Sequence, residues 1–344
     1  MAADEMPRNL EPMLATAATA LPGGDGWAYE VKWDGIRALA HIAAEELRIA
    51  ARRGEDVSGR YPELAAIPAA LPGRELILDG ELVAFDEDGN PSFGLLQRRM
   101  GLTNEGRIRQ RVADTPVTYV AFDLLWLDGR SLLADPYERR RELLAELGFD
   151  GPSWQAPGHS VGDGEALLAA SRERGLEGIV AKRLASTYRP GRRSPDWVKV
   201  QNRRRQELVI GGYMPGEGGR SHRLGSLLVG YWDATPEEAA GIGRAQRLVY
   251  AGGVGTGFTQ TALGELTDLL APLRRETSPF EAGWDPELKY AARIRERGPL
   301  VWVEPVVVCE VEFLSWTHED TVRAASYKGV RDDKDARDVI REVG

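Results

Sequence analysis

The chain has 344 residues and a formal net charge of −9, with 42% hydrophobic and 28% charged residues, which is ordinary for a globular protein large enough for two cores. No apolar run could span a membrane, and the acidic N-terminus lacks the order of a signal peptide. The single cysteine, Cys309, excludes an intrachain disulfide and, with four scattered histidines, a zinc cluster, so we expect a cytoplasmic protein.

The segment from Glu30 to Arg37 places a lysine, an aspartate, a glycine and an arginine between two strand-like runs. This pattern predicts two strands joined by a tight connection, in which Gly35 gives the backbone freedom to turn. A lysine held near an arginine and out of bulk water has a lowered pKa, and the neutral amine of Lys32 would be a nucleophile. The alternative is a surface hairpin in which Asp34 pairs with Lys32 or Arg37.

Two strand-like segments follow that carry charged residues. Residues 47–51 alternate as a strand and end at Arg52, and residues 76–85 are apolar except for Asp-Gly-Glu, which contains Asp79 and Glu81. Buried carboxylates are costly unless a metal, a cation or a hydroxyl takes up the charge. A hairpin turn at Asp79 and the following glycine is the alternative, but it does not account for Glu81.

The next elements alternate between core strands and helices. Residues 118–126 predict a buried strand containing Phe122, whose usual fate is core packing. Residues 137–148 and 162–174 predict helices that end at glycine. Glu177 then precedes a short buried strand, and its alternative roles are to cap the preceding helix or to pair with a nearby arginine.

A cationic stretch closes this half of the chain. Between Lys182 and Arg205 there are nine basic residues and one acid, Asp196, on an otherwise acidic protein. A phosphate-binding surface and a solvated flexible segment are both compatible with this pattern. Beyond it, short strands, glycine turns and one helix at 259–273 are typical of an OB-fold, a small barrel that binds nucleic acids. We therefore expect one domain over 1–203 and a second over 204–344.

Taken together, six of these segments resemble, in order, the motifs of the covalent-lysine nucleotidyltransferases, which include ATP-dependent DNA ligases and mRNA capping enzymes. The resemblance covers nearly the whole chain and is closest to the ligase domain of the bacterial end-joining ligase D group. The motifs are Lys-x-Asp-Gly-x-Arg at 32–37, Asp-Gly-Glu at 79–81, Phe-Asp-Leu-Leu at 122–125, Glu-Gly-x-x-x-Lys at 177–182, Trp-x-Lys at 197–199 and Arg-x-Asp-Lys at 331–334.

The resemblance implies an α+β fold, with an ATP-grasp-like nucleotidyltransferase domain of antiparallel sheets and helices followed by an OB-fold β-barrel. It implies that Lys32 attacks the α-phosphorus of ATP, with Asp34 and Arg37 as further catalytic residues. The AMP then passes to the 5′-phosphate of a DNA nick, and the 3′-hydroxyl displaces it.

The resemblance also implies ligand roles. Glu81 and Glu177 would hold Mg²⁺ or Mn²⁺. The residues expected to bind the nucleotide are Glu30 at the adenine, Phe122 stacked on the purine, and Lys32, Arg37, Arg52, Glu81, Lys182, Lys199, Arg331 and Lys334. The chain departs from the family pattern twice: Ala51 replaces the serine before Arg52, and Gln201 stands where many relatives have a second lysine, which leaves that phosphate contact in doubt.

The partners implied are nicked or broken duplex DNA and a Ku-like end-binding protein, with no membrane, for a monomeric, nucleoid-associated enzyme of non-homologous end joining. The enzymatic alternatives are an mRNA guanylyltransferase and an RNA ligase. An alternative of another class is a non-catalytic nucleic-acid-binding module, against which the intact Lys32, Glu81, Glu177 and Lys199 argue.

Overall fold

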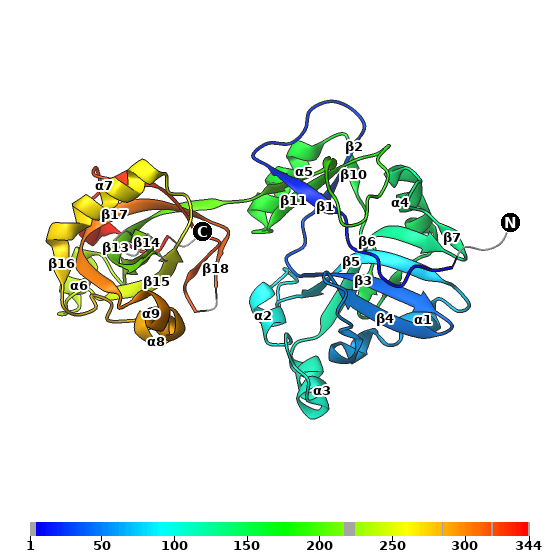
Figure 1. Cartoon of the computed structure of the whole chain (residues 1–344), viewed down its shortest axis with the longest axis horizontal. Coiled ribbons are helices and arrows are strands. Elements are labelled where there is room, and N and C mark those ends of the chain that lie inside the picture. Colours follow the sequence, from blue (N-terminus) through cyan, green and yellow to red (C-terminus); the bar gives the residue numbers. More distant parts are fainter. Residues whose placement is uncertain (1–4, 217–223, 284, 318, 343–344) are drawn as a thin grey trace. The chain divides into compact units, whose positions relative to one another are not determined.

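The computed structural model describes residues 5–216, 224–283, 285–317 and 319–342 (Figure 1). The chain divides into two compact units, Met1–Asn202 (unit 1) and Arg203–Gly344 (unit 2), and each is described by itself. Within the described ranges, no helix is long and apolar enough to cross a membrane.

Unit 1 contains a five-stranded sheet in which β1 runs parallel to its neighbour and the other pairs are antiparallel. One face of this sheet packs its apolar side chains, among them Tyr29, Ile179 and Val200, against Leu168 of helix α5. Alternate residues point to the opposite face, which is left for the site described below. In spatial order the strands are β1 (Leu14–Ala18), β12 (Arg193–Gln201), β11 (Gly178–Arg183), β2 (Trp27–Val31) and β10 (Ser160–Val161).

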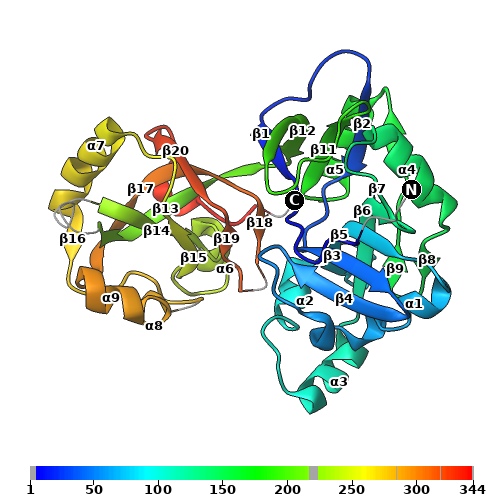
Figure 2. The ribbon, with the colours of Figure 1, turned by 45° about the vertical axis from the view of Figure 1, so that its right-hand side comes forward.

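The second sheet of unit 1 has seven strands and the larger apolar core. Helix α4 lies against β6, as Figures 1 and 2 both show. The strands in spatial order are β4 (Glu46–Ala51), β3 (Ile36–Ala43), β5 (Leu76–Ala84), β6 (Val117–Leu127), β9 (Trp154–Gln155) and β8 (Asp150–Gly151), with β7 (Arg130–Ser131) also on β6. The helices of unit 1 are η1 (Ser58–Arg60), η2 (Pro62–Leu64), α1 (Ile67–Ala70), α2 (Phe93–Gln97), α3 (Glu105–Asp114), α4 (Tyr137–Glu146) and α5 (Gly164–Glu173).

Two glycines in unit 1 serve close packing. Asp79, Gly80 and Glu81 lie inside the single strand β5, so the hairpin alternative at Asp79 is wrong. A Cβ on Gly80 would lie 2.6 Å from the Tyr119 ring, and a Cβ on Gly35 would lie 2.2 Å from the carbonyl oxygen of Leu82. Gly35 lies at a bend in the short connection between β2 and β3, as expected, but its φ is outside the left-handed region, and a glycine is required there because the chain passes directly against β5.

Unit 2 contains a six-stranded sheet with a large apolar core and a second, smaller apolar cluster, and β17 pairs with β13, β16 and β20. The helix expected at 259–273 is confirmed as α7 and η4, but the expectation of only one helix is wrong. The helix α6 begins at a Thr235–Glu238 capping box. The strands are β13 (Arg204–Pro215), β14 (Leu224–Trp232), β15 (Leu248–Val254), β16 (Arg274–Arg275), β17 (Val301–Phe313), β18 (Ser315–Trp316), β19 (Val322–Arg323) and β20 (Ser326–Arg331), and the helices are α6 (Pro236–Gly241), α7 (Gln260–Leu270), η4 (Ala271–Leu273), α8 (Pro286–Lys289), α9 (Ala291–Arg297) and η5 (Ala336–Asp338).

Candidate active site

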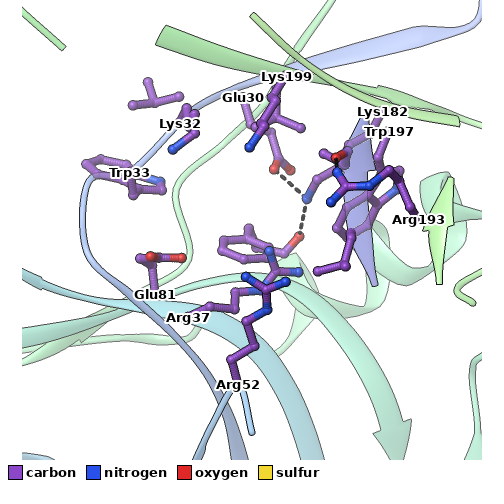
Figure 3. Close-up of a pocket in the computed structure, with 15 residues that line it drawn as sticks. Glu30, Lys32, Trp33, Arg37, Arg52, Glu81, Lys182, Arg193, Trp197 and Lys199 are labelled. Carbon is purple, nitrogen blue, oxygen red and sulfur yellow. Dashed lines mark hydrogen bonds and ion pairs between the residues drawn. The ribbon is translucent and has the colours of Figure 1, made fainter. Parts of the chain in front are cut away.

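A pocket of ≈ 210 Å³ lies between the two sheets of unit 1 (Figure 3). The five-stranded sheet contributes residues two apart along three neighbouring strands, because such residues share one face. These residues are Glu30 on β2 and Lys32 directly after it, Val180 and Lys182 on β11, and Trp197 and Lys199 on β12. The seven-stranded sheet and its edges contribute Arg37, Arg52, Glu81 and Phe122, and the remaining lining residues are Leu14, Ala15, Val31, Trp33 and Arg193.

The charge of the pocket is opposite to that of the whole chain. Six cationic side chains and two carboxylates line it, although the chain carries a net charge of −9. Cations gathered in a concave site with low-dielectric walls attract anions strongly. The pocket is therefore suited to a polyphosphate.

Lys32 lies beside Glu177 because three strand ends meet there. The Lys32 backbone N–H donates to the carbonyl of Gly178 over 2.9 Å, which places the lysine next to the residue that precedes β11. The Lys32 ammonium forms an ion pair with Oε2 of Glu177. Gln201, at the end of β12, donates from Nε2 to Oε1 of the same carboxylate over 2.7 Å. Glu177 is thus held from both sides.

Glu81 is the carboxylate that faces the pocket from β5 (Figure 3). Its burial raises its pKa to about 8, although the neighbouring charges of Arg37 and Lys32 act in the opposite direction. On the facing sheet, burial and the charge of Lys32 lower the pKa of Lys199. Both groups therefore lie where an incoming anion or cation would change their protonation.

Arg37 is fixed at the pocket by a buried partner. Its Nε and Nη2 donate to the two carboxylate oxygens of Asp79 over 2.5 and 2.6 Å, and its guanidinium lies 4.6 Å from the centre of the Phe122 ring. Burial alone would lower the pKa of Arg37, but the Asp79 carboxylate outweighs it and the pKa is raised. Arg37 is therefore a permanent cation of fixed orientation.

Lys182 occupies the deep end of the pocket. Its Nζ lies 2.6 Å from Oε2 of Glu30 and is surrounded by the rings of Trp197, Phe122 and Tyr137, with centroids at 4.3, 4.5 and 5.0 Å. Burial lowers the pKa of Lys182 and the Glu30 carboxylate opposes this shift. A hydrogen-bond donor and an acceptor stand side by side against an aromatic face, an arrangement that suits the edge of a purine base.

The structure brings eight of the predicted site residues together in this pocket: Glu30, Lys32, Arg37, Arg52, Glu81, Phe122, Lys182 and Lys199. Glu177 adjoins it through Lys32. Asp34 follows Lys32 in the connection to β3 but is not among the lining residues. Arg331 and Lys334 belong to unit 2, where Arg331 pairs with Glu207 and Asp333 and Lys334 is exposed.

Several lining residues were not predicted from the sequence. Trp197 lies two residues before Lys199 on β12, so strand alternation could have identified it. Arg193 begins the same strand, where its guanidinium donates to the Ala15 carbonyl. Leu14 and Ala15, which also line the pocket, belong to β1. No local pattern predicts the pairing of β1 with β12.

The described part of the chain contains no cluster of three or more histidine, cysteine, aspartate or glutamate residues that could hold a metal ion alone. Mg²⁺, however, is usually held by one or two carboxylates together with substrate phosphates. Glu81, which faces the pocket, and Glu177, next to Lys32, provide oxygen donors of that kind. The residues present therefore fit a divalent cation that arrives with a polyphosphate.

Two family models match the chain: the ATP dependent DNA ligase domain over residues 12–201 and the ATP dependent DNA ligase C terminal region over residues 220–334. The chain is 41% identical over 335 residues to the multifunctional non-homologous end joining DNA repair protein LigD of Mycobacterium tuberculosis, covering 97% of this chain and 40% of that protein. The LigD of Pseudomonas aeruginosa is 38% identical, over 98% of this chain and 37% of that protein. The chain therefore spans about 40% of the length of these curated relatives.

Solved structures agree with these matches. The ligase domain of M. tuberculosis LigD is 38% identical with a TM-score of 0.51, covering 97% of this chain and 99% of that one. A mycobacterial DNA ligase D complexed with ATP and MES is also 38% identical, with a TM-score of 0.53 and the same coverage.

Proposed function

The chain belongs to the ATP-dependent DNA ligase family, and we propose that its pocket seals 3′-hydroxyl/5′-phosphate nicks in duplex DNA through an AMP carried on Lys32. Its α+β fold is that of the family, a nucleotidyltransferase unit followed by an OB-fold unit, as expected. We assign the adenylation role to residues 1–203 and the OB-fold role to residues 204–344.

The observation that carries this proposal is the position of Lys32. Its amine lies at a polyphosphate-sized cationic pocket, paired with one carboxylate, Glu177, and close to a second, Glu81. Lysine attack on a phosphorus requires a free amine in line with the leaving group, and the position of Lys32 at the pocket wall supports its assignment as the nucleophile.

In the first step, the Lys32 amine forms a bond to the α-phosphorus of ATP while the bond from that phosphorus to the bridging oxygen breaks and pyrophosphate leaves. The Lys32 side chain is 20% exposed, and its ammonium first passes its proton to solvent water as the ion pair with Glu177 breaks. Glu81 and Glu177 are the residues that would hold Mg²⁺ or Mn²⁺, which when bound neutralises phosphate charge. Lys199 and Arg37 neutralise the remaining charge on the phosphates.

In the second and third steps, a 5′-phosphate oxygen of the nick displaces Lys32 from the AMP, and the 3′-hydroxyl then displaces AMP to form the phosphodiester. We assign Asp34 to the sealing step and Arg52, exposed at the pocket edge, to the phosphates. Glu30, Lys182 and Phe122 would receive the adenine.

Two further groups complete the proposal. Arg331 and Lys334 of unit 2 would approach the triphosphate during adenylation. The exposed arginines of the loop before β12, such as Arg189 and Arg192, would contact the DNA backbone. Contacts of this kind release counterions, so binding should weaken steeply with salt.

We also propose a setting for the reaction. Relatives over the whole chain are named as non-homologous end joining proteins, so we place this chain in the joining of broken DNA ends. A Ku-like end-binding protein would bring it to those ends. We expect the protein to act as a monomer in the cytoplasm, at the nucleoid.

A nick-sealing assay tests the function against its enzymatic alternatives. Purified protein is incubated with ATP or GTP, and with nicked DNA or nicked RNA, and joined product is resolved on a denaturing gel. We expect joining only with ATP and DNA, and its loss in Lys32→Ala. Joining of RNA alone, or transfer of GMP alone, would indicate an RNA ligase or a guanylyltransferase. A protein that binds DNA without forming an adduct would be a non-catalytic module.

A further inference from the structure

Four groups close a ring of hydrogen bonds behind the pocket. The Tyr188 hydroxyl donates to Oδ2 of Asp79 over 2.6 Å and accepts the backbone N–H of Met13 over 2.8 Å. The same Oδ2 accepts from Nη2 of Arg37 over 2.6 Å, and that nitrogen also lies 3.3 Å from the carbonyl oxygen of Met13. Met13, Tyr188, Asp79 and Arg37 are thus connected around a closed path.

Three members of this ring are shielded from water. Met13 and Asp79 are fully buried and Tyr188 is 3% exposed, whereas the Arg37 side chain is 23% exposed and reaches the pocket. Hydrogen bonds to a charged group in such surroundings are strong, and a buried group that loses its partner is destabilised. The four groups therefore hold one another in place, and the guanidinium of Arg37 is the part of the ring that reaches the pocket.

We propose that Tyr188 is a positioning residue for the ligase reaction, which acts through Asp79 to aim the Arg37 guanidinium at bound ATP. This inference rests on the proposed function. Asp79 can rotate about its side-chain bonds when only Arg37 holds it, and the two would then move together. The hydroxyl of Tyr188 fixes the carboxylate, and the Met13 N–H fixes that hydroxyl.

The aromatic walls of the pocket depend on the same residue. The Tyr188 ring packs edge-on against Trp197, with centroids 5.7 Å apart, and Trp197 and Phe122 flank the Arg37 guanidinium at 5.7 and 4.6 Å. Tyr188→Phe keeps this ring contact and removes only the hydroxyl. The variant therefore separates the effect of the hydroxyl hydrogen bond to Asp79 from the effect of ring packing against Trp197.

The test is a double-mutant cycle on adduct formation from labelled ATP, measured in single turnover over a range of ATP concentrations with the full chain. Tyr188→Phe should lower kcat/KM for the adduct about tenfold in the wild-type background. In an Arg37→Gln background, the same change should cost less than about twofold, because the group it positions is already gone. A merely structural role would cost the same in both backgrounds.

Controls separate the possible outcomes. Tyr250→Phe removes a buried hydroxyl in unit 2, where it bonds to Tyr290 over 3.1 Å, and should leave adduct formation unchanged. Asp79→Asn changes the carboxylate that accepts hydrogen bonds from both Tyr188 and Arg37. It is run in a second cycle with Arg37→Gln, in case Tyr188→Phe does not fold.

Additive losses in either cycle, or a full rate in folded Tyr188→Phe, would overturn the positioning role while the proposed function stood. A wild-type protein that forms no adduct would instead overturn the proposed function and, with it, this inference.

Discussion

The amide of Gln201 donates to Oε1 of Glu177 over 2.7 Å, while Lys32 pairs with Oε2 of the same carboxylate. Gln201 stands where the family pattern has a second lysine that contacts a phosphate. In this chain a neutral donor holds Glu177 instead. Gln201 therefore orients the carboxylate without adding a second cation beside Lys32.

Gln201→Ala should slow adenylation. The variant removes the donor that orients Glu177, and a hydrogen bond to a charged group is worth about 1.5–3 kcal/mol, so we expect a decrease of at least about tenfold in the single-turnover rate. Gln246→Ala is the matched control, because that amide holds backbone carbonyls in unit 2. Equal rates for Gln201→Ala and wild type would show that Glu177 is held without Gln201.

Glu81→Gln should raise the metal concentration needed for adenylation. The change removes a carboxyl oxygen donor that faces the pocket and that a bound cation would hold in its ionised form, but it keeps the size of the side chain. We expect the midpoint of a Mg²⁺ or Mn²⁺ titration to rise at least about tenfold. Glu75→Gln, at an exposed position before β5, is the control. An unchanged midpoint, or full activity after rigorous chelation, would remove the metal role of Glu81.

His41 should make the protein sensitive to acid. Its burial, with a smaller effect of Arg48, lowers its pKa to about 4, and the described structure offers no partner for its Nε2. The pKa of His41 in the folded state lies below its value in the unfolded chain, so the neutral imidazole is favoured by folding. The contribution of His41 to the free energy of unfolding is therefore complete above about pH 6.5 and is lost as the pH falls toward 4. The loss amounts to about 2–3 kcal/mol between pH 7 and 4.5.

His41→Leu should lack this component. Urea unfolding followed by tryptophan fluorescence would measure it, as the difference in unfolding free energy between wild type and variant at each pH. That difference should shift in favour of the variant as the pH falls. Parallel curves for the two proteins would contradict the assignment.

Arg192→Gln should weaken DNA binding and its salt dependence together. Arg192 is exposed in the loop before β12, and a lost phosphate contact lowers the slope of log K against log salt by about one. Arg139→Gln is the control, because that exposed arginine on α4 is already paired with Glu142 and Glu146. Anisotropy titrations of nicked duplex at several salt concentrations would measure both slopes, and an unchanged slope for Arg192→Gln would place the backbone contact elsewhere.

The resemblance to the family motifs placed Lys32, Lys182 and Lys199 at one site, and all three line the pocket. The helices at 137–148 and 162–174 were confirmed as α4 and α5 because their glycine stops and apolar spacing are local signals.

Relationships between distant strands could not be predicted in the same way. The bond from Tyr188 to Asp79 joins residues 109 positions apart, and that from Gln201 to Glu177 depends on the register of β11 with β12. Gly35 was assigned to a turn because glycine commonly serves one, whereas the tertiary approach to Leu82 requires it. Pairing and register decide these features, and neither is contained in a local window of sequence.

The most direct test of the account is to locate the AMP on the protein. Three lysines line the pocket, Lys32, Lys182 and Lys199, and only Lys32 is assigned as the nucleophile. The protein is incubated with ATP and Mg²⁺, digested under conditions that preserve phosphoramides, and mapped by mass spectrometry. We predict AMP on Lys32 alone and no adduct in Lys32→Arg. AMP on Lys182 or Lys199, or an adduct of full yield in Lys32→Arg, would contradict the account.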